Sequence, residues 1–140
     1  MRALLIAVLL LPLMATAQTI SCRVVGVADG DTLTCLAAGN QQIKVRLNQI
    51  DAPEKGQAFG QAAKRKLSSL VHGRQVVLRI DGLDKYGRTI AEVFSDGLNV
   101  NKEMVRSGYA WAYREYVRDI CVLMEVETSC RLMEMDCRFC

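Results

Sequence analysis

The sequence predicts an α+β domain that is mainly a β-barrel, namely a five-stranded OB-fold barrel with two to three helices. Two observations carry this prediction: five short runs have the alternating hydrophobicity of strands, and a long helical pattern follows the third run. The resulting order, β-β-β-α-β-β-α-α, is that of OB barrels, which commonly bind nucleic acids or sugars. Because one fold serves many functions, the function has to be argued from particular residues.

The five predicted strands end at clusters of turn residues. They cover residues 20–28, 32–37, 42–50, 74–81 and 88–95. The Asp-Gly pair at 29–30 is a strong hairpin signal between the first two strands, and residues 38–40 form a second turn. In the third strand the alternation loses its phase at residues 49–50, directly before two carboxylates, Asp51 and Glu54.

The helix that follows is predicted over residues 57–72, and Gly73 stands where a C-terminal cap glycine belongs. Its apolar stripe consists of Ala62, Ala63, Leu67, Leu70 and Val71. A shorter helix is predicted over residues 99–107 and ends at Gly108. Apolar residues at helical spacing from residue 120 onward predict a third helix.

The first seventeen residues have the pattern of a secretory signal peptide. Arg2 precedes an apolar run at 3–14, and the small residues at 15–17 fit a cleavage site, so we expect cleavage before Gln18. A membrane anchor is the alternative, but the run has about 12 residues where a span needs roughly 20. We therefore expect a secreted or periplasmic protein with no membrane anchor after cleavage.

The expected mature chain has the size of one small domain, which we divide into a barrel over residues 18–118 and a tail over 119–140. Of the 18 Lys and Arg residues only Arg2 precedes this chain, which leaves 17 basic against 15 acidic residues. So small an excess argues against charge-dominated binding of the histone type. Any contact with a nucleic acid must then come from a local patch.

The tail is atypically rich in Cys and Met. Its cysteines are Cys121, Cys130, Cys137 and Cys140. The Cys137-x-x-Cys140 pair resembles half of a zinc knuckle, but no histidine follows it and the other two cysteines are wrongly spaced. We expect disulfides or free thiols there rather than zinc.

Cys22 and Cys35 flank the first hairpin. A two-residue turn would place Cys22 opposite Ala37, so that Cys35 is a diagonal neighbour at about 7–8 Å, slightly too far for a bridge. A bulge or a longer loop would bring the cysteines opposite each other. Because export permits disulfides, we predict a Cys22–Cys35 bridge, the alternative being two small buried thiols.

Charged residues gather in four places along the chain. They are the turn at 29–31, Arg46, the pair Asp51 and Glu54, and the segment 84–88. Each has an ordinary explanation as a hairpin turn, a solvated charge or a helix start. Together they fit phosphodiester hydrolysis, which needs cations at the phosphate and an oriented water. Arginines suit phosphate, an oxygen-only ligand set suits calcium, and a further carboxylate can activate water.

Four segments of the chain resemble the thermonuclease family, typified by staphylococcal nuclease. They are VVGVADGDTL (24–33), VRLNQIDAPEKGQAFGQAAK (45–64), DKYGRTIAEVF (84–94) and LNVNKEMVRSGYAWAY (98–113). The resemblance covers about residues 20–118, with the motifs in order at family-like spacing. It implies a calcium-dependent, sugar-nonspecific nuclease on an OB barrel, acting on DNA and RNA and leaving 3′-phosphates. We expect it to be a monomer.

The resemblance also implies a metal site and a phosphate site. Asp31 and Asp51 match the calcium-binding aspartates of the family. Ala52 stands where the family often has threonine, but only the backbone carbonyl is a ligand at that position. Arg46 and Arg88 match the two arginines that bind the phosphate.

The remaining roles implied by the resemblance concern water and substrate. Glu54 matches the glutamate that handles the attacking water. Lys85 and Tyr86 match residues that contact the terminal phosphate of the nucleotide, and Tyr113 matches an aromatic residue that stacks on the base.

Two other classes of function stay open. One is a non-catalytic OB-fold module that binds nucleic acid, a class that tends to lose the acids and arginines that this chain keeps. The other is an exported polysaccharide-binding barrel, for which little in the sequence calls for two arginines beside three acids. The segment 120–140 departs from the family, whose members usually end with a charged helix and a Gly-Leu/Ile-Trp run.

Overall fold

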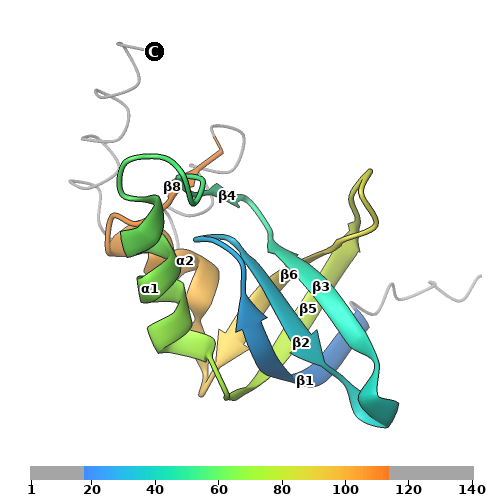
Figure 1. The fold of residues 1–140 in the computed structure, drawn as a ribbon. Coiled ribbons are helices and arrows are strands. Elements are labelled where there is room, and N and C mark those ends of the chain that lie inside the picture. Colours follow the sequence, from blue (N-terminus) through green and yellow to red (C-terminus); the bar gives the residue numbers. More distant parts are fainter. Residues whose placement is uncertain (1–17, 114–140) are drawn as a thin grey trace, which may run out of the picture.

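A computed structural model describes residues 18–113 of the chain (Figure 1). The strands are β1 (Gln18–Val27), β2 (Thr32–Leu36), β3 (Gln42–Leu47), β4 (Ile50–Asp51), β5 (Gln75–Leu83), β6 (Thr89–Ser95), β7 (Leu98–Asn99) and β8 (Trp111–Ala112). The helices are α1 (Gly60–Val71) and α2 (Val100–Arg106), with a short 3-10 turn at Ala38–Asn40. The expected signal peptide, the tail with its four cysteines and the expected third helix lie outside the described residues.

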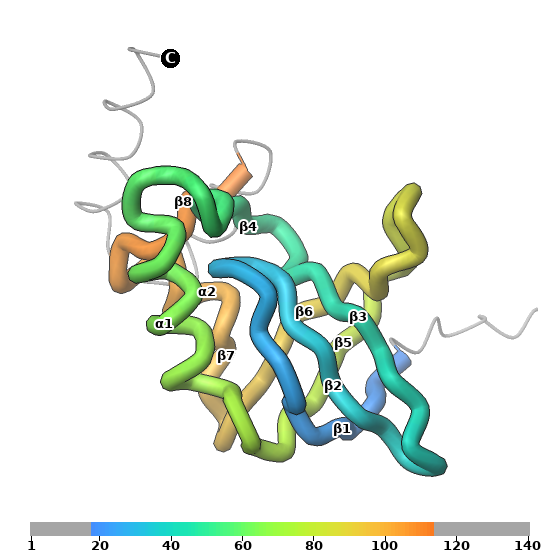
Figure 2. Tube along the Cα trace, viewed as in Figure 1, coloured from blue at the N-terminus to red at the C-terminus, as the bar shows by residue number. Residues whose placement is uncertain are grey.

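The five longest strands form a closed, mixed barrel (Figure 2). The sheet order is β3-β2-β1-β5-β6-β7, in which all neighbours run antiparallel. The parallel pair β3–β6 closes the barrel, with Val45 opposite Thr89 and Leu47 opposite Ala91. This topology confirms the predicted five-stranded OB-fold barrel.

The core is built from alternate residues of the barrel strands and from one face of each helix. Its largest fully buried members are Leu33, Leu47, Ile50, Leu67, Leu78 and Met104. Helix α1 packs against β1 and α2, while α2 packs against β6, so both helices lie together on one side of the barrel (Figure 1). In residues 18–113 no helix is long and apolar enough to cross a membrane.

The predicted third strand is wrong at its end, where the structure has two strands. β3 stops at Leu47 because Gln49 adopts a left-handed conformation with φ of 63°. Leu47 and Ile50 are both buried although they are three positions apart. The alternation of buried and exposed residues is therefore shifted by one residue at the predicted phase break. The redirected segment, β4, pairs with β8, a short strand that the sequence pattern did not indicate.

The first predicted helix is also too long at its start. Helix α1 begins at Gly60 rather than at residue 57, and Phe59 before it has a left-handed φ of 62°. The residues from 52 to 59 therefore form a loop over the end of the barrel. This loop carries Glu54.

The predicted disulfide between Cys22 and Cys35 is confirmed, with a Cα–Cα distance of 5.7 Å. Its predicted geometry is wrong, because Cys35 lies opposite Val24 and is still a diagonal neighbour of Cys22. A longer turn and a bulge are both present between β1 and β2, but their effects on the register cancel. Strand twist brings one diagonal of a ladder closer than the other, which allows the bridge.

Candidate active site

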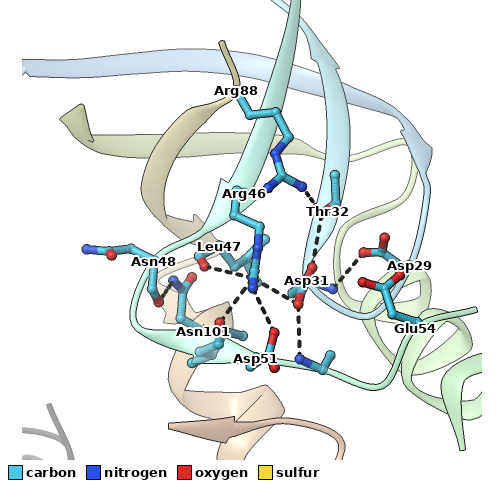
Figure 3. Close-up of polar contacts among 12 residues, drawn as sticks. Asp29, Asp31, Thr32, Arg46, Leu47, Asn48, Asp51, Glu54, Arg88 and Asn101 are labelled. Carbon is cyan, nitrogen blue, oxygen red and sulfur yellow. Dashed lines mark hydrogen bonds and ion pairs between the residues drawn. The ribbon is translucent and has the colours of Figure 1, made fainter. Parts of the chain in front are cut away.

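Arg46 is at the centre of a group of acidic residues at one end of the barrel (Figure 3). From β3, its Nη1 atom lies 2.9 Å from Oδ2 of Asp31 and its Nη2 atom lies 2.9 Å from Oδ1 of Asp51. Nη1 also donates to the carbonyl oxygens of Ile50 (3.0 Å) and Leu47 (3.4 Å). One guanidinium thus links the two aspartates that were predicted to bind calcium.

Asp31 is the buried acid of this group. Its Oδ2 accepts a hydrogen bond from the backbone N–H of Ala52 (3.0 Å) and its Oδ1 accepts one from the Thr32 hydroxyl (3.0 Å). Burial raises the pKa of Asp31 to about 6, although the positive charge of Arg46 acts in the opposite direction. The positive charge of Arg46 therefore does not fully offset the cost of burying the carboxylate, and a further cation would stabilise its charged form.

The turn that carries Asp31 depends on Gly30. A Cβ atom added at this position would come within 2.7 Å of the Cβ atoms of both Ala52 and Ala63. The hairpin turn therefore packs directly against the loop after β4 and against α1. This close approach holds Asp31 beside Ala52, the residue directly after Asp51.

Arg88 reaches the same site from the residue before β6. Its Nη1 atom lies 3.5 Å from the Thr32 hydroxyl, and its Nε atom donates to Oδ2 of Asp84 at 2.6 Å. Desolvation works against the charged form of Asp84, but hydrogen bonds from Arg88 and Tyr86 outweigh it and lower the pKa of this carboxyl group. Asp84 thus holds the guanidinium of Arg88 in place.

The two arginines border one hollow of about 200 Å³, which we call the arginine hollow. It is lined by Arg46, Leu47, Asn48, Gln49, Ile50, Asp84, Arg88, Ile90 and Tyr113. The exposed side chain of Tyr113 is thus brought to the predicted phosphate-binding residues. Its backbone N–H donates to the carbonyl of Gln49 at 3.1 Å, which connects the segment after β8 to the turn before β4.

Glu54 lies in the loop before α1 and is exposed. This loop closes on itself, because the backbone N–H of Glu54 donates to Oε1 of Gln57 and the N–H of Gln57 donates to the Glu54 carbonyl, both at 2.8 Å. Figure 3 shows the Glu54 side chain on the side of the site where Asp29 and Asp31 lie. Within residues 18–113 its carboxyl group forms no ion pair.

Lys85 and Tyr86 form the exposed tip between β5 and β6, which projects from the barrel (Figure 1). The Tyr86 ring has the Lys85 ammonium 5.0 Å and the Arg88 guanidinium 5.5 Å from its centroid. The tip is therefore positively charged and is attached to the site through Arg88. The structure places all nine predicted site residues at one end of the barrel.

A calcium ion would find oxygen ligands at this end. Asp31 and Asp51 converge on Arg46, and Ala52 is held against Asp31 by its N–H. In the part of the chain that the structure describes, no three His, Cys, Asp or Glu side chains are grouped as a metal cluster. The donor atoms still fit calcium, because all of them are oxygens and one belongs to the buried carboxylate of Asp31, whose charge Arg46 does not fully offset.

Sequence reasoning missed two residues that position the site, Thr32 and Asn101, and it named Asp84 within the charged segment 84–88 without giving it a role. The buried Asn101 accepts from the N–H of Val93 (3.0 Å) and donates to the carbonyls of Asn48 (2.9 Å) and Ala91 (3.2 Å). It thereby fixes the end of β3 just before the left-handed turn. A polar residue inside the apolar pattern of a short helix was the available signal.

The amino-acid sequence of this chain is similar to those of known proteins. Residues 44–131 match the family described as "Staphylococcal nuclease homologue". An "Uncharacterized endonuclease" of Haemophilus influenzae is 53% identical over 109 residues, which make up 78% of this chain and 61% of that protein.

Two further relatives have lower identity. An "Uncharacterized endonuclease" of Escherichia coli O157:H7 is 43% identical over 98 residues, or 69% of this chain and 63% of that protein. A protein named "Micrococcal nuclease" in Shigella flexneri is 42% identical over 103 residues, or 67% of this chain and 59% of that protein. The chain thus spans 59–63% of the length of these relatives.

Proposed function

Because this chain belongs to the staphylococcal nuclease family, we propose that it is an exported, calcium-dependent nuclease. It hydrolyses phosphodiester bonds of DNA and RNA by attack of an activated water and leaves 3′-phosphates. The observation that carries the proposal is the arrangement around Arg46, which links Asp31 and Asp51 beside the second arginine, Arg88.

The two arginines bind the scissile phosphate in the arginine hollow. A planar guanidinium donates paired hydrogen bonds to two phosphate oxygens, and its charge offsets the negative charge that grows as phosphorus becomes five-coordinate. Asp84 fixes the orientation of Arg88, and the two aspartates fix that of Arg46. A calcium ion held by Asp31, Asp51 and the Ala52 carbonyl would supply a further positive charge to the phosphate.

Glu54 orients the attacking water and accepts its proton. The water oxygen forms a bond to phosphorus, the bond from phosphorus to the 5′ oxygen breaks, and the leaving oxygen takes a proton from solvent to become a hydroxyl. The phosphate then remains on the 3′ side. Because Glu54 lies in a loop that is closed by two hydrogen bonds to Gln57, its backbone is already positioned before substrate binds.

Substrate contacts outside the phosphate involve aromatic and basic side chains. Lys85 and Tyr86 meet the terminal phosphate of the nucleotide, while Tyr113 stacks on a base. Stacking does not depend on the identity of the base or the sugar, so DNA and RNA are both substrates.

Export is supported by the disulfide in the barrel. Disulfides persist in oxidising compartments such as the periplasm or the medium and are rare in the cytosol. The Cys22–Cys35 bridge therefore agrees with the signal peptide that the sequence predicts.

The test is an assay of DNA and RNA digestion with calcium and with a calcium chelator. We expect turnover only with calcium, and we expect Arg46→Ala, Arg88→Ala and Glu54→Gln each to lower kcat on the order of 10²- to 10³-fold. Arg74→Ala is the matched control, because Arg74 forms an exposed ion pair with Asp96 away from the site.

Three results would contradict the proposal in different ways. Full activity in chelator would show that calcium is not required. Near-normal activity in all three site variants would show that the roles proposed for these residues are wrong. Binding of nucleic acid without any cleavage would replace the nuclease by a non-catalytic binding module.

A further inference from the structure

A second hollow, which reaches Trp111 of β8, is not used by the chemistry proposed above. Its volume is about 440 Å³. It is lined by Pro53, Gln57, Ala58, Phe59, Ala63, Gly108, Tyr109 and Trp111, none of which carries a charge. We call it the aromatic hollow, after its three aromatic residues.

The exposed aromatic residues of the described chain gather around the two hollows. Phe59 and Trp111 line the aromatic hollow, Tyr113 lines the arginine hollow, and Tyr86 contacts the guanidinium of Arg88. These four side chains are between 49% and 80% exposed. In contrast, the exposed aliphatic residues Val25, Val77, Leu83 and Leu98 line neither hollow. Exposed rings are thus concentrated beside the charged site.

The aromatic hollow is joined directly to the candidate active site. Trp111 is the partner of Asp51 in the antiparallel β4–β8 pair, and opposite residues in such a pair lie about 5 Å apart. Pro53, in the wall of the hollow, follows Ala52 immediately in the chain. A nucleotide chain whose phosphate lies at Arg46 is therefore close to both hollows.

Phe59 is held in solvent by its backbone. Its φ of 62° is uncommon for a residue with a side chain, and the next residue, Gly60, is buried. The side chain is 80% exposed, so it contributes little to the stability of the fold. A large ring displayed in this way beside a hollow is typical of a binding surface.

We propose that the aromatic hollow is a second base-binding subsite, which holds an unpaired base of single-stranded DNA or RNA next to the nucleotide bound at the arginine hollow. This proposal rests on the proposed nuclease function. A base is flat, aromatic and uncharged, which suits a hollow that has exposed rings and no charge. The two hollows then hold two neighbouring bases of the same strand.

The chain offers a direct probe of this subsite, because Trp111 is its only tryptophan. The experiment uses the full chain carrying Glu54→Gln, with calcium, titrated with single-stranded oligothymidylate and with thymidine 3′,5′-bisphosphate. We expect oligothymidylate to quench Trp111 emission to saturation. The mononucleotide, which fills the arginine hollow alone, should change it far less.

Substitutions at the hollow separate stacking from other effects. Phe59→Ala and Trp111→Ala should weaken oligothymidylate binding, followed by anisotropy of a labelled oligonucleotide, by roughly 5- to 150-fold. Neither change should alter mononucleotide affinity. Phe59→Tyr should retain binding because it keeps a ring, and Leu98→Ala removes an exposed apolar side chain from β7 as the control.

The outcomes distinguish this subsite from the nuclease activity. If otherwise wild-type chains with Phe59→Ala and Trp111→Ala cleave single-stranded DNA with unchanged KM, the subsite is wrong while the nuclease stands. If iodide fails to quench Trp111 before oligonucleotide is added, another segment or a second copy covers the hollow, and the proposal is also wrong. If binding depends on the rings but the chain cleaves no nucleic acid, the subsite is supported and the proposed nuclease activity is wrong.

Discussion

Tyr113 is the residue that we propose to contribute to substrate binding rather than to bond cleavage. It lines the arginine hollow, and its backbone N–H donates to the carbonyl of Gln49. Tyr113→Ala should therefore raise KM for DNA by roughly 5- to 150-fold, the value of one stacked base, with a smaller change in kcat. Steady-state kinetics measure both constants.

Tyr113→Phe is the matched control, because it keeps the ring and loses only the hydroxyl group. A variant with normal KM and strongly reduced kcat would show that Tyr113 lies at the reacting group instead.

At the residue scale, the charged residues of the site were easier to predict from the sequence than the residues that hold them in position. Taken singly, Arg46, Asp31 and Asp51 have ordinary explanations, and it was their combination and the family resemblance that indicated a site. Thr32 was missed because its importance lies in its contact with Arg88 across the barrel. Such contacts depend on the register of distant strands, which a local pattern does not contain.

The loop before α1 leads to a prediction at the scale of one element. A Cβ atom at Gly60 would overlap the carbonyl of Glu54, so Gly60→Ala has to displace the loop that carries the proposed base. A shift of about 1 Å at a catalytic group can cost on the order of 10²-fold, and we expect a loss of kcat of that size. Cleavage assays at saturating DNA measure it.

Gly56→Ala is the control within the same loop. An added Cβ at Gly56 meets no atom within 4 Å, and the residue has no left-handed backbone. Its kcat should stay near that of the wild type. Equal losses in both glycine variants would mean that the loop is sensitive to any stiffening, not to the position of Glu54.

Helix α2 and α1 are joined by an ion-pair network around the buried Glu103. Its carboxylate lies 2.6 Å from Nη2 of Arg106 and 3.4 Å from Nζ of Lys66. Hydrogen bonds from Arg106, together with those from Lys66, outweigh desolvation and lower the pKa of Glu103 below its ordinary 4.5. A lowered folded-state pKa means that this contribution to stability is complete above pH 4.5 and is lost as the pH falls through the folded pKa.

We therefore expect Glu103→Gln to lower the free energy of unfolding by about 1.5 kcal/mol at neutral pH, since it removes charged hydrogen bonds to partly exposed partners. The difference from wild type should shrink as the pH falls below 4.5. Urea unfolding at neutral and acidic pH measures it. A difference that is the same at both values would show that the charge of Glu103 is not what stabilises the helix pair.

At the element scale, strands and helices were predictable where periodicity is long, and their junctions were not. The core strands and α1 follow from repeated apolar spacing. The division of the third strand at Gln49 and the pairing of β4 with β8 depend on a left-handed residue and on a partner far along the chain. Two-residue strands have too few residues to show any period.

The disulfide concerns the whole molecule, because it ties β1 to β2 beneath the turn that carries Asp31. Cys22 and Cys35 are 13 residues apart in sequence. Closing a loop of this size restricts the unfolded chain, so the double variant Cys22→Ala/Cys35→Ala should lose roughly 3 kcal/mol of unfolding free energy. The double variant leaves the cysteines of the tail unchanged, and urea unfolding measures the loss.

Peptide mapping of the wild type without reduction is the control, and it should recover the two cysteine peptides as one linked species. Free thiols at both positions, or a double variant as stable as the wild type, would contradict the prediction.

The parallel closure between β3 and β6 has a consequence for when the protein becomes active. Arg46 lies on β3 and Arg88 directly precedes β6, so the two cations meet only when these distant strands pair. Contacts between distant segments carry the largest loop-closure cost and slow folding. Under the proposed export, an unfolded chain would therefore pass the cell's own DNA without a competent site, and barrel closure outside the cytosol would complete that site.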